Sequence, residues 1–157
     1  MKICCVFNYN PHYRLPIYRA MSENLGCDFF FGDKIDQPIK QFDPSLLKGF
    51  KGYISPKSLK IGKYGFAWYT GISAIFKRDY THYIMTGSPS YILNWLILVY
   101  SKIFRKKTFL WCHGLRQKKT GIRAWYHRLF YGSADGIFMY GKKPTFKELY
   151  KWTKYKM

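Results

Sequence analysis

The sequence predicts one α/β domain, a single Rossmann-like, doubly wound unit with a mostly parallel sheet. Three observations lead to this fold class. Short apolar runs alternate along the chain with segments of helical periodicity, as they do in βαβ units. A length of 157 residues suits one domain with one hydrophobic core. Hydrophobic residues form 48% of the chain and aromatic residues 21%, which argues against disorder.

The predicted parallel strands are five short apolar runs: Ile3–Phe7, Cys27–Phe31, His82–Thr86, Thr108–Cys112 and Gly136–Tyr140. The fourth run is uninterrupted and is bounded by charge on one side and by His113-Gly114 on the other. This pattern predicts a fully buried strand in the interior of the sheet.

The predicted helices lie between these strands. The first starts at Pro16 and ends at Gly26, because proline favours the first turn of a helix and glycine favours its end. Gly87-Ser88-Pro89 reads as a turn, an N-cap and a first helical residue. The helix that follows, Pro89–Phe104, is apolar on most sides and is expected to be buried. Further helices are predicted within Gln41–Tyr53 (with a short strand), over Gly65–Phe76, along the stripe Ile122, Trp125, Leu129 and Phe130, and from Pro144 to near Tyr155.

The chain carries a large excess of positive charge. Lys and Arg number 27 against 8 Asp and Glu, a formal net charge of +19. No acidic residue occurs between Asp79 and Asp135. One face of the domain is therefore expected to attract polyanions such as nucleic acid, anionic lipid or diphosphate-bearing substrates. A solvated basic face without a partner is the alternative.

The cysteines and the apolar segments indicate a cytoplasmic protein. Cys4, Cys5, Cys27 and Cys112 lie in or beside apolar runs without CxxC spacing, as buried free thiols of a reducing compartment do. No signal peptide is expected, since few apolar residues precede Asn8. The longest apolar segment, Tyr91–Phe104, is too short for a bilayer span, which needs about 20 apolar residues.

His113 is the first candidate for a functional residue. It directly follows a predicted parallel strand, and ligands of open α/β sheets bind beyond the carboxyl ends of the strands. A histidine in an ordinary turn is the alternative. The helix that follows Gly87 and Ser88 presents free N–H groups toward the same crevice, which favours an anion there.

The loop after the first strand supplies further candidates: His12, Tyr13 and Arg14. Arg14 is expected either to pair with an anionic substrate group or to cap a carbonyl. The loop lacks the GxGxxG fingerprint, and no GxxxxGK[ST] motif occurs in the chain. No NAD or ATP site of the usual kind is therefore expected. No metal is expected either, because Cys112-His113 lacks a second pair at ligand spacing, and no other cofactor is predicted.

Three stretches together resemble one family. NYNPHYRLPIYRAM, KTFLWCHGL and SADGIFMYG are similar, in this order, to segments of bacterial glycosyltransferases of the GT4-like type. The resemblance implies a GT-B enzyme, in which an N-terminal Rossmann-like domain holds the acceptor and a C-terminal one binds the nucleotide-sugar donor. It also implies that His113 positions the transferred sugar and that the loop after the first strand shapes the acceptor site. The remaining substrate-binding candidates are Gly87, Ser88, Gly114 and Arg116.

The chain also departs from this family. Its first loop lacks a Gly-Gly pair found in some relatives, and Glu23 and Glu148 do not form the Glu-x7-Glu motif of the donor domain. Residues 1–157 are thus expected to be the acceptor-side domain alone: a fragment, a truncated product or a subunit of a split enzyme. In isolation it is expected to fold but not to catalyse.

The implied substrate is a glycan or lipid-linked acceptor, used in cell-surface polysaccharide synthesis. A peripheral contact with the anionic inner face of the cytoplasmic membrane is expected through basic residues, namely Lys102, Arg105–Lys107, Arg116, Lys118, Lys119, Arg123 and Arg128. The main rival is a basic nucleic-acid-binding α/β domain, although no RRM, KH, zinc-finger or helix-turn-helix signature is present. A glycosidase lacks a carboxylate pair near the crevice, and a purely structural module is the remaining alternative.

Overall fold

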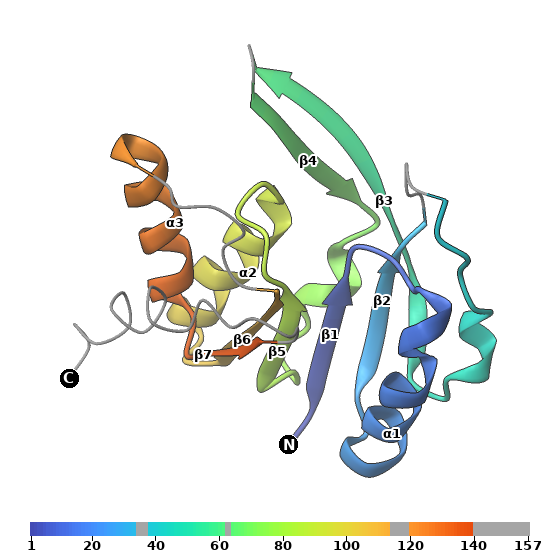
Figure 1. The fold of residues 1–157 in the computed structure, drawn as a ribbon. Helices are drawn as coiled ribbons and strands as arrows, with labels where there is room; N and C mark the ends of the chain where they lie inside the picture. Colours follow the sequence, from blue (N-terminus) through green and yellow to red (C-terminus); the bar gives the residue numbers. More distant parts are fainter. Residues whose placement is uncertain (34–37, 62–63, 114–119, 140–157) are drawn as a thin grey trace.

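The fold is an α/β domain built on one curled, mostly parallel sheet, which confirms the predicted Rossmann-like class (Figure 1). The computed structural model describes residues 1–33, 38–61, 64–113 and 120–139. In this part of the chain the strand order is β4-β3-β2-β1-β5-β6-β7. The strands are β1 (Ile3–Phe7), β2 (Asp28–Gly32), β3 (Phe50–Ile61), β4 (Tyr64–Thr70), β5 (His82–Thr86), β6 (Lys107–Cys112) and β7 (Gly136–Met139).

The strands pair in parallel except at one edge of the sheet. There the second half of β3 forms an antiparallel hairpin with β4, which Figure 1 shows projecting beyond the other strands. The parallel strands follow the doubly wound order, in which the chain moves outward from β1 in one direction and then, from β5, in the other.

The helices cover the two faces of the sheet separately. The helix α1 (Leu15–Leu25) buries Tyr18 and Met21 against one face, while α2 (Ile92–Ile103) and α3 (Gly121–Ser133) pack on the other. Each face thus has its own apolar cluster. Short 3₁₀ turns are η1 (His12–Arg14), η2 (Pro44–Leu46) and η3 (Ser73–Phe76).

The five predicted strands are all present in the sheet. β1 and β5 have the predicted bounds, β2 lies one residue later than expected, and β6 begins one residue earlier. β6 is an interior strand between β5 and β7, as predicted. It is not fully buried, however, since Phe109 and Trp111 are only half-buried on the face that α1 shares. Gly26 ends α1 in the left-handed conformation, with φ of 59°, as its position in the sequence indicates.

The helix predicted over Gly65–Phe76 is wrong. This segment forms β4 and then η3. Aromatic residues favour strands, and pairing with β3 overrides the weak helical spacing. The short helix and strand expected within Gln41–Tyr53 correspond to η2 and the start of β3, but β3 continues to Ile61.

The helix predicted at Pro89 begins later, at Ile92. Pro89 and Ser90 form a turn, and Tyr91 is extended beside β4. The Ala67 N–H donates to the Ser90 carbonyl at 3.0 Å, and Ala67 forms a bridge with Tyr91. The helix predicted along the stripe Ile122, Trp125, Leu129 and Phe130 is confirmed, since all four residues lie in α3. Phe130 is buried, but the side chains of Ile122, Trp125 and Leu129 are exposed. The helix predicted from Pro144 to Tyr155 lies outside the described residues.

The expected free thiols are confirmed, since Cys4, Cys5, Cys27 and Cys112 are all buried and unpaired in disulfides. Burial raises the pKa of the Cys4 thiol well above its ordinary value. Among the helices described, none has both the length and the apolar character that a bilayer span requires.

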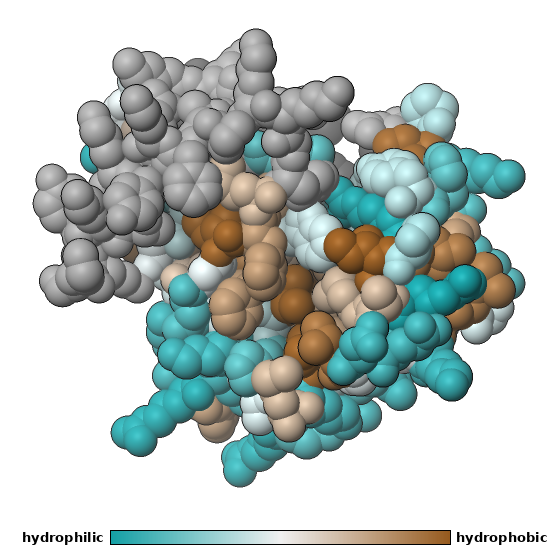
Figure 2. Space-filling model, turned by 60° about the horizontal axis from the view of Figure 1, so that its bottom comes forward, coloured by the Kyte–Doolittle hydropathy of each residue, from teal (hydrophilic) through white to brown (hydrophobic). Residues whose placement is uncertain are grey.

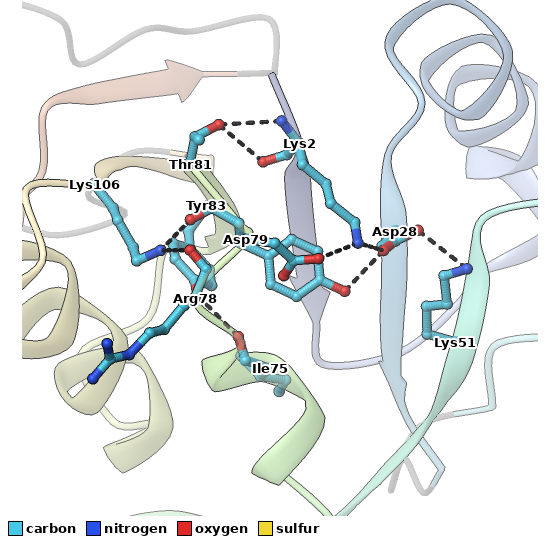
Figure 3. Close-up of polar contacts among 10 residues, drawn as sticks. Lys2, Asp28, Lys51, Ile75, Arg78, Asp79, Thr81, Tyr83 and Lys106 are labelled. Carbon is cyan, nitrogen blue, oxygen red and sulfur yellow. Dashed lines mark hydrogen bonds and ion pairs between the residues drawn. The ribbon is translucent and has the colours of Figure 1, made fainter.

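At the amino ends of the parallel strands, which we call the amino edge of the sheet, acidic side chains form ion pairs with lysines (Figure 3). Asp28 accepts a hydrogen bond from the Tyr80 hydroxyl at 2.8 Å and lies 3.4 Å from the Lys51 ammonium. Asp79 lies 2.5 Å from the Lys2 ammonium, which is also 3.8 Å from Asp28. When this edge is turned toward the viewer, hydrophilic side chains line the lower rim and apolar ones cross the middle of the surface (Figure 2).

A β-bulge lies near the start of β3. Phe29 of β2 pairs with Phe50, but the next pair joins Phe30 to Gly52, so Lys51 has no partner in β2. Gly52 has a φ of 152°, a conformation that favours glycine. The bulge directs the Lys51 side chain to Asp28 at the amino edge.

Candidate functional site

The strand order places a topological switch point between β1 and β5. From this point the chain moves to β2 in one direction and to β6 in the other. Crevices for ligands form at such points, beyond the carboxyl ends of the strands. The residues that follow these ends are Asn8 after β1, Gly87 and Ser88 after β5, and His113 after β6.

A hydrogen-bonded network of neutral side chains closes the switch point. The Asn8 N–H donates to the Thr86 hydroxyl at 3.2 Å, and this hydroxyl donates to Asn8 Oδ1 at 3.1 Å. Asn94 of α2 donates through Nδ2 to the carbonyls of Thr86 at 2.6 Å and Ser88 at 2.9 Å. β1, β5 and α2 are thus joined at the carboxyl edge, and the turn around Gly87 is held in one conformation.

Two tyrosines fill the space beside this network. The side chain of Asn8 donates to the Tyr91 hydroxyl at 3.3 Å, and the Tyr69 and Tyr91 rings meet edge to face at 5.7 Å. The cavity that remains is about 10 Å³, lined by Val6, Asn8, Ile54, Tyr69, Thr86 and Tyr91 among others. This volume holds about one water molecule. This cavity, among the residues that the structure describes, is too small for a sugar or a nucleotide.

The environment of the two tyrosines keeps their hydroxyls protonated. Burial raises the pKa of Tyr69 strongly, and the neighbouring Tyr91 hydroxyl adds to the effect. Burial also raises the pKa of Tyr91, although the hydrogen bond from Asn8 opposes this shift. Both side chains stay neutral near pH 7. Their role is therefore structural, through packing and hydrogen bonds, and not that of acid–base groups.

Gly87 is required by a close approach to β6. Its N–H donates to the Trp111 carbonyl at 2.9 Å, and a Cβ at this position would lie 2.8 Å from the Cβ of Cys112. Its carbonyl accepts from the Tyr131 hydroxyl of α3 at 3.1 Å. Gly87 therefore ties β5 to the end of β6, while Ser88 is half-buried within the same turn.

The β1 loop lies beside this edge, but its predicted residues divide into two groups. His12 is exposed and contacts Lys40, two residues before Phe42. The backbone N–H of His12 donates to the Lys40 carbonyl at 3.0 Å, and His12 Nδ1 lies 3.1 Å from the same oxygen. His12 thus anchors the loop. Tyr13 is exposed, and its ring contacts the guanidinium of Arg14.

Arg14 connects the β1 loop to β6. Its guanidinium carbon lies 5.8 Å from the ring centroids of both Tyr13 and Trp111, and its Nη1 donates to the Tyr18 hydroxyl at 3.3 Å. The Arg14 residue is 9% exposed. The guanidinium lies against two aromatic rings, an arrangement stabilised by cation–π attraction.

His113 lies at the carboxyl end of β6, two residues after Trp111, and is exposed. The structure therefore brings Tyr13, Arg14 and the end of β6 to one edge, with Gly87 beside it. Two predicted site residues, Gly114 and Arg116, lie outside the described residues. Near this edge, sequence reasoning missed Asn8, Trp111 and Asn94. A single asparagine within the apolar run of α2 was the signal for Asn94, and a position just after a buried strand was the signal for Asn8.

The described residues contain no group of three or more His, Cys, Asp or Glu side chains that could hold a metal ion. Asn10 is the one buried polar side chain of the β1 loop with an unpaired atom in the described structure: its Nδ2 donates to the Phe42 carbonyl at 2.5 Å, while Oδ1 has no partner. Comparisons of the chain with family models, with curated protein sequences and with solved structures found no match.

Proposed function

We propose that this chain is the acceptor-side half of a glycosyltransferase, which holds a glycan or lipid-linked acceptor while a sugar is transferred from a nucleotide-sugar. The observation that carries the proposal is the convergence of Tyr13, Arg14, Trp111 and His113 at the carboxyl edge of a doubly wound sheet. This edge is where folds of this class bind ligands.

The chemistry of these side chains suits an acceptor with sugar rings and an anionic group. Tyrosine and tryptophan rings offer flat apolar faces together with a polar edge, as binding sites for amphipathic ligands require. Arg14 supplies a cation beside them, and the guanidinium keeps its charge at all physiological pH values. Tyr69 and Tyr91 together fill the space beside the Asn8–Thr86 network, and we call this pair the plug. We therefore place the ligand on the face of the sheet that α1 covers.

His113 is proposed to orient the transferred sugar through a hydrogen bond. Its imidazole is exposed at the end of β6, so it is accessible to a ligand at this edge. A positioned hydrogen-bonding group accelerates transfer by holding the reacting atoms in line. Transfer also needs the departing nucleotide diphosphate to be held and its charge offset. The sequence has no Asp-x-Asp motif to recruit a metal for that task, so we assign the task to a separate donor-binding domain.

The test is binding of acceptor probes to the purified chain, followed by NMR. The probes are a short polyprenyl phosphate that carries one sugar, UDP-glucose, and single-stranded oligothymidylate. We expect saturable binding of the first probe with shifts at Tyr13 and His113, and only weak, salt-sensitive binding of the second. His113→Ala should weaken the first interaction, whereas His82→Ala, a histidine at the amino end of β5, should not.

Three results would contradict the proposal. If oligothymidylate binds tightly and the glycolipid does not, the chain is the basic nucleic-acid-binding domain that its charge also permits. If His113→Ala and His82→Ala bind the glycolipid equally well, the acceptor site lies elsewhere. Sugar transfer by the isolated chain would show that the active site has been misplaced.

A further inference from the structure

The outer surface of α2 and α3 carries an exposed apolar face. On α2 the exposed side chains are Leu96, Val99 and Ile103, and on α3 they are Ile122, Trp125 and Leu129. We call these six residues the outer ridges. Both sets follow the spacing i, i+3, i+7, so each forms one continuous ridge along its helix. Ile103, Ile122 and Trp125 are 68%, 78% and 62% exposed.

The ridges are not needed for the hydrophobic core. The core-facing side of α2 buries Leu93, Ile97 and Leu98, and that of α3 buries Phe130 and Tyr131. α2 is therefore apolar on both its inner and its outer side, which is typical of helices that are surrounded by apolar material. Exposed apolar patches of this kind mark interaction surfaces.

The two ridges lie side by side. Trp95 of α2 contacts the rings of Tyr126 and Phe130 of α3, with centroids 5.2 Å and 5.1 Å apart, and Trp95 Nε1 lies 3.0 Å from the Tyr126 hydroxyl. The helices also belong to the same layer on one face of the sheet. The ridges therefore form one surface and not two isolated strips.

The charged residues on α2 and α3, and in the turn that follows α2, are all basic. Lys102 and Arg105 lie at the end of α2, and Arg123 and Arg128 lie on α3, while the sequence has no Asp or Glu between Asp79 and Asp135. A second copy of this chain would bring like charges together, which disfavours self-association. An anionic lipid surface suits both the apolar ridges and the basic residues, since it offers an apolar interior for the ridges and phosphates for the cations.

We propose that α2 and α3 dock in the plane of an anionic membrane. The six ridge side chains enter the boundary between headgroups and acyl chains, and the four basic residues contact lipid phosphates. The Trp125 indole suits this boundary, because its ring is apolar and its N–H is polar. The docking surface is separate from the carboxyl edge of the sheet and does not depend on which reaction, if any, takes place there.

The test is co-sedimentation of the chain with vesicles of phosphatidylcholine alone and of phosphatidylcholine with about 30% phosphatidylglycerol. We expect binding to the mixed vesicles to be at least about tenfold tighter and to weaken with salt. The double substitution Val99→Ser with Trp125→Ser should weaken this binding by about tenfold or more. The matched control, Ile17→Ser with Leu25→Ser, removes two exposed apolar side chains from α1 and should leave binding unchanged.

A second measurement tests insertion directly. Brominated lipids should quench part of the tryptophan fluorescence of the wild-type chain, and Trp125→Phe should lose this quenching while it keeps its affinity for the vesicles. Equal binding to neutral and anionic vesicles, or equal loss in the ridge and α1 variants, would overturn the proposal. So would sedimentation velocity that shows a dimer in the wild type and a monomer in the Val99→Ser, Trp125→Ser variant.

Discussion

The two edges of the sheet are built from different interactions. At the amino edge, acidic side chains on β2 and before β5 pair with lysines and with the Tyr80 hydroxyl. At the carboxyl edge, neutral asparagine, threonine and tyrosine side chains bond to one another, and Arg14 stacks on rings. The amino edge thus contributes mainly to stability, whereas the carboxyl edge is where we propose that the acceptor binds. Substitutions at the two edges should separate these roles.

The largest effect is expected at the end of β2. A Cβ on Gly32 would lie 2.0 Å from the Asn8 carbonyl oxygen, so Gly32→Ala forces the β1 loop away from β2. We expect a loss of about 3 kcal/mol in the free energy of unfolding, measured by urea titration. Gly132→Ala is the control, because a Cβ there meets nothing within 4 Å and alanine favours the helix. If both variants have the same urea midpoint, the close approach is not rigid.

The next effect concerns the amino edge. Asp28→Ala removes the acceptor of the buried Tyr80 hydroxyl and the partner of Lys51, and should cost about 2–3 kcal/mol. Adding Tyr80→Phe should recover part of this loss, since the unsatisfied hydroxyl is then removed. Glu23→Ala, on the exposed side of α1, is the control. Additive effects of Asp28→Ala and Tyr80→Phe would show that this hydrogen bond contributes nothing.

A smaller, pH-dependent effect is expected at Asp135. Burial acts to raise the pKa of this carboxyl, but hydrogen bonds from the Thr108 N–H at 2.9 Å and hydroxyl at 3.1 Å, together with Lys107, lower it overall. A lowered pKa in the folded state stabilises the fold above the unfolded pKa of about 3.9, and this contribution is lost as the pH falls through the folded pKa.

Asp135→Asn should therefore cost about 1 kcal/mol at pH 7, and the difference from the wild type should shrink as the pH is lowered. Urea titrations of both proteins at neutral and acidic pH measure it. A difference that stays constant across this range would mean that the carboxylate charge plays no part.

The substitution with the smallest expected effect on stability lies at the carboxyl edge. It is also the one with the largest expected effect on function. His113→Ala replaces an exposed side chain and should change the free energy of unfolding by less than about 0.5 kcal/mol. In a protein that joins this chain to a donor-binding domain, it should lower kcat about a hundredfold. Thermal unfolding and a transfer assay on the same sample measure both. Near-normal turnover would remove His113 from the proposed site.

Sequence reasoning located the interior strands well and the surfaces poorly. The run Ile3–Phe7 is apolar because β1 is covered on both faces, so burial and sequence pattern agree. The apolar helix predicted over Pro89–Phe104 was expected to be buried, although Leu96, Val99 and Ile103 of α2 face outward. Periodicity identifies a helix face as apolar, but it does not say what covers that face.

The sequence predicted some parts of the candidate site and missed others. The positions of His113, Gly87 and the β1 loop at one edge follow from the order of strands, which a βαβ pattern implies. The stacking of Arg14 on Trp111 does not, because it joins segments far apart in the sequence. The plug of Tyr69 and Tyr91 was missed because β4 itself was read as a helix.

The bulge in β3 makes one position of this strand tolerant of a change in chain length. Phe50 packs with the cluster beneath α1, whereas Ile54 packs with the opposite cluster, although four residues would normally return the strand to the same face. The extra residue, Lys51, makes up the difference. Deletion of Lys51 would leave Tyr53 and Ile54 on their present faces and lose only the ion pair with Asp28, whereas deletion of Ile54 would reverse every later residue against β4. Homologues that differ by one residue in this strand are therefore expected to differ at the bulge.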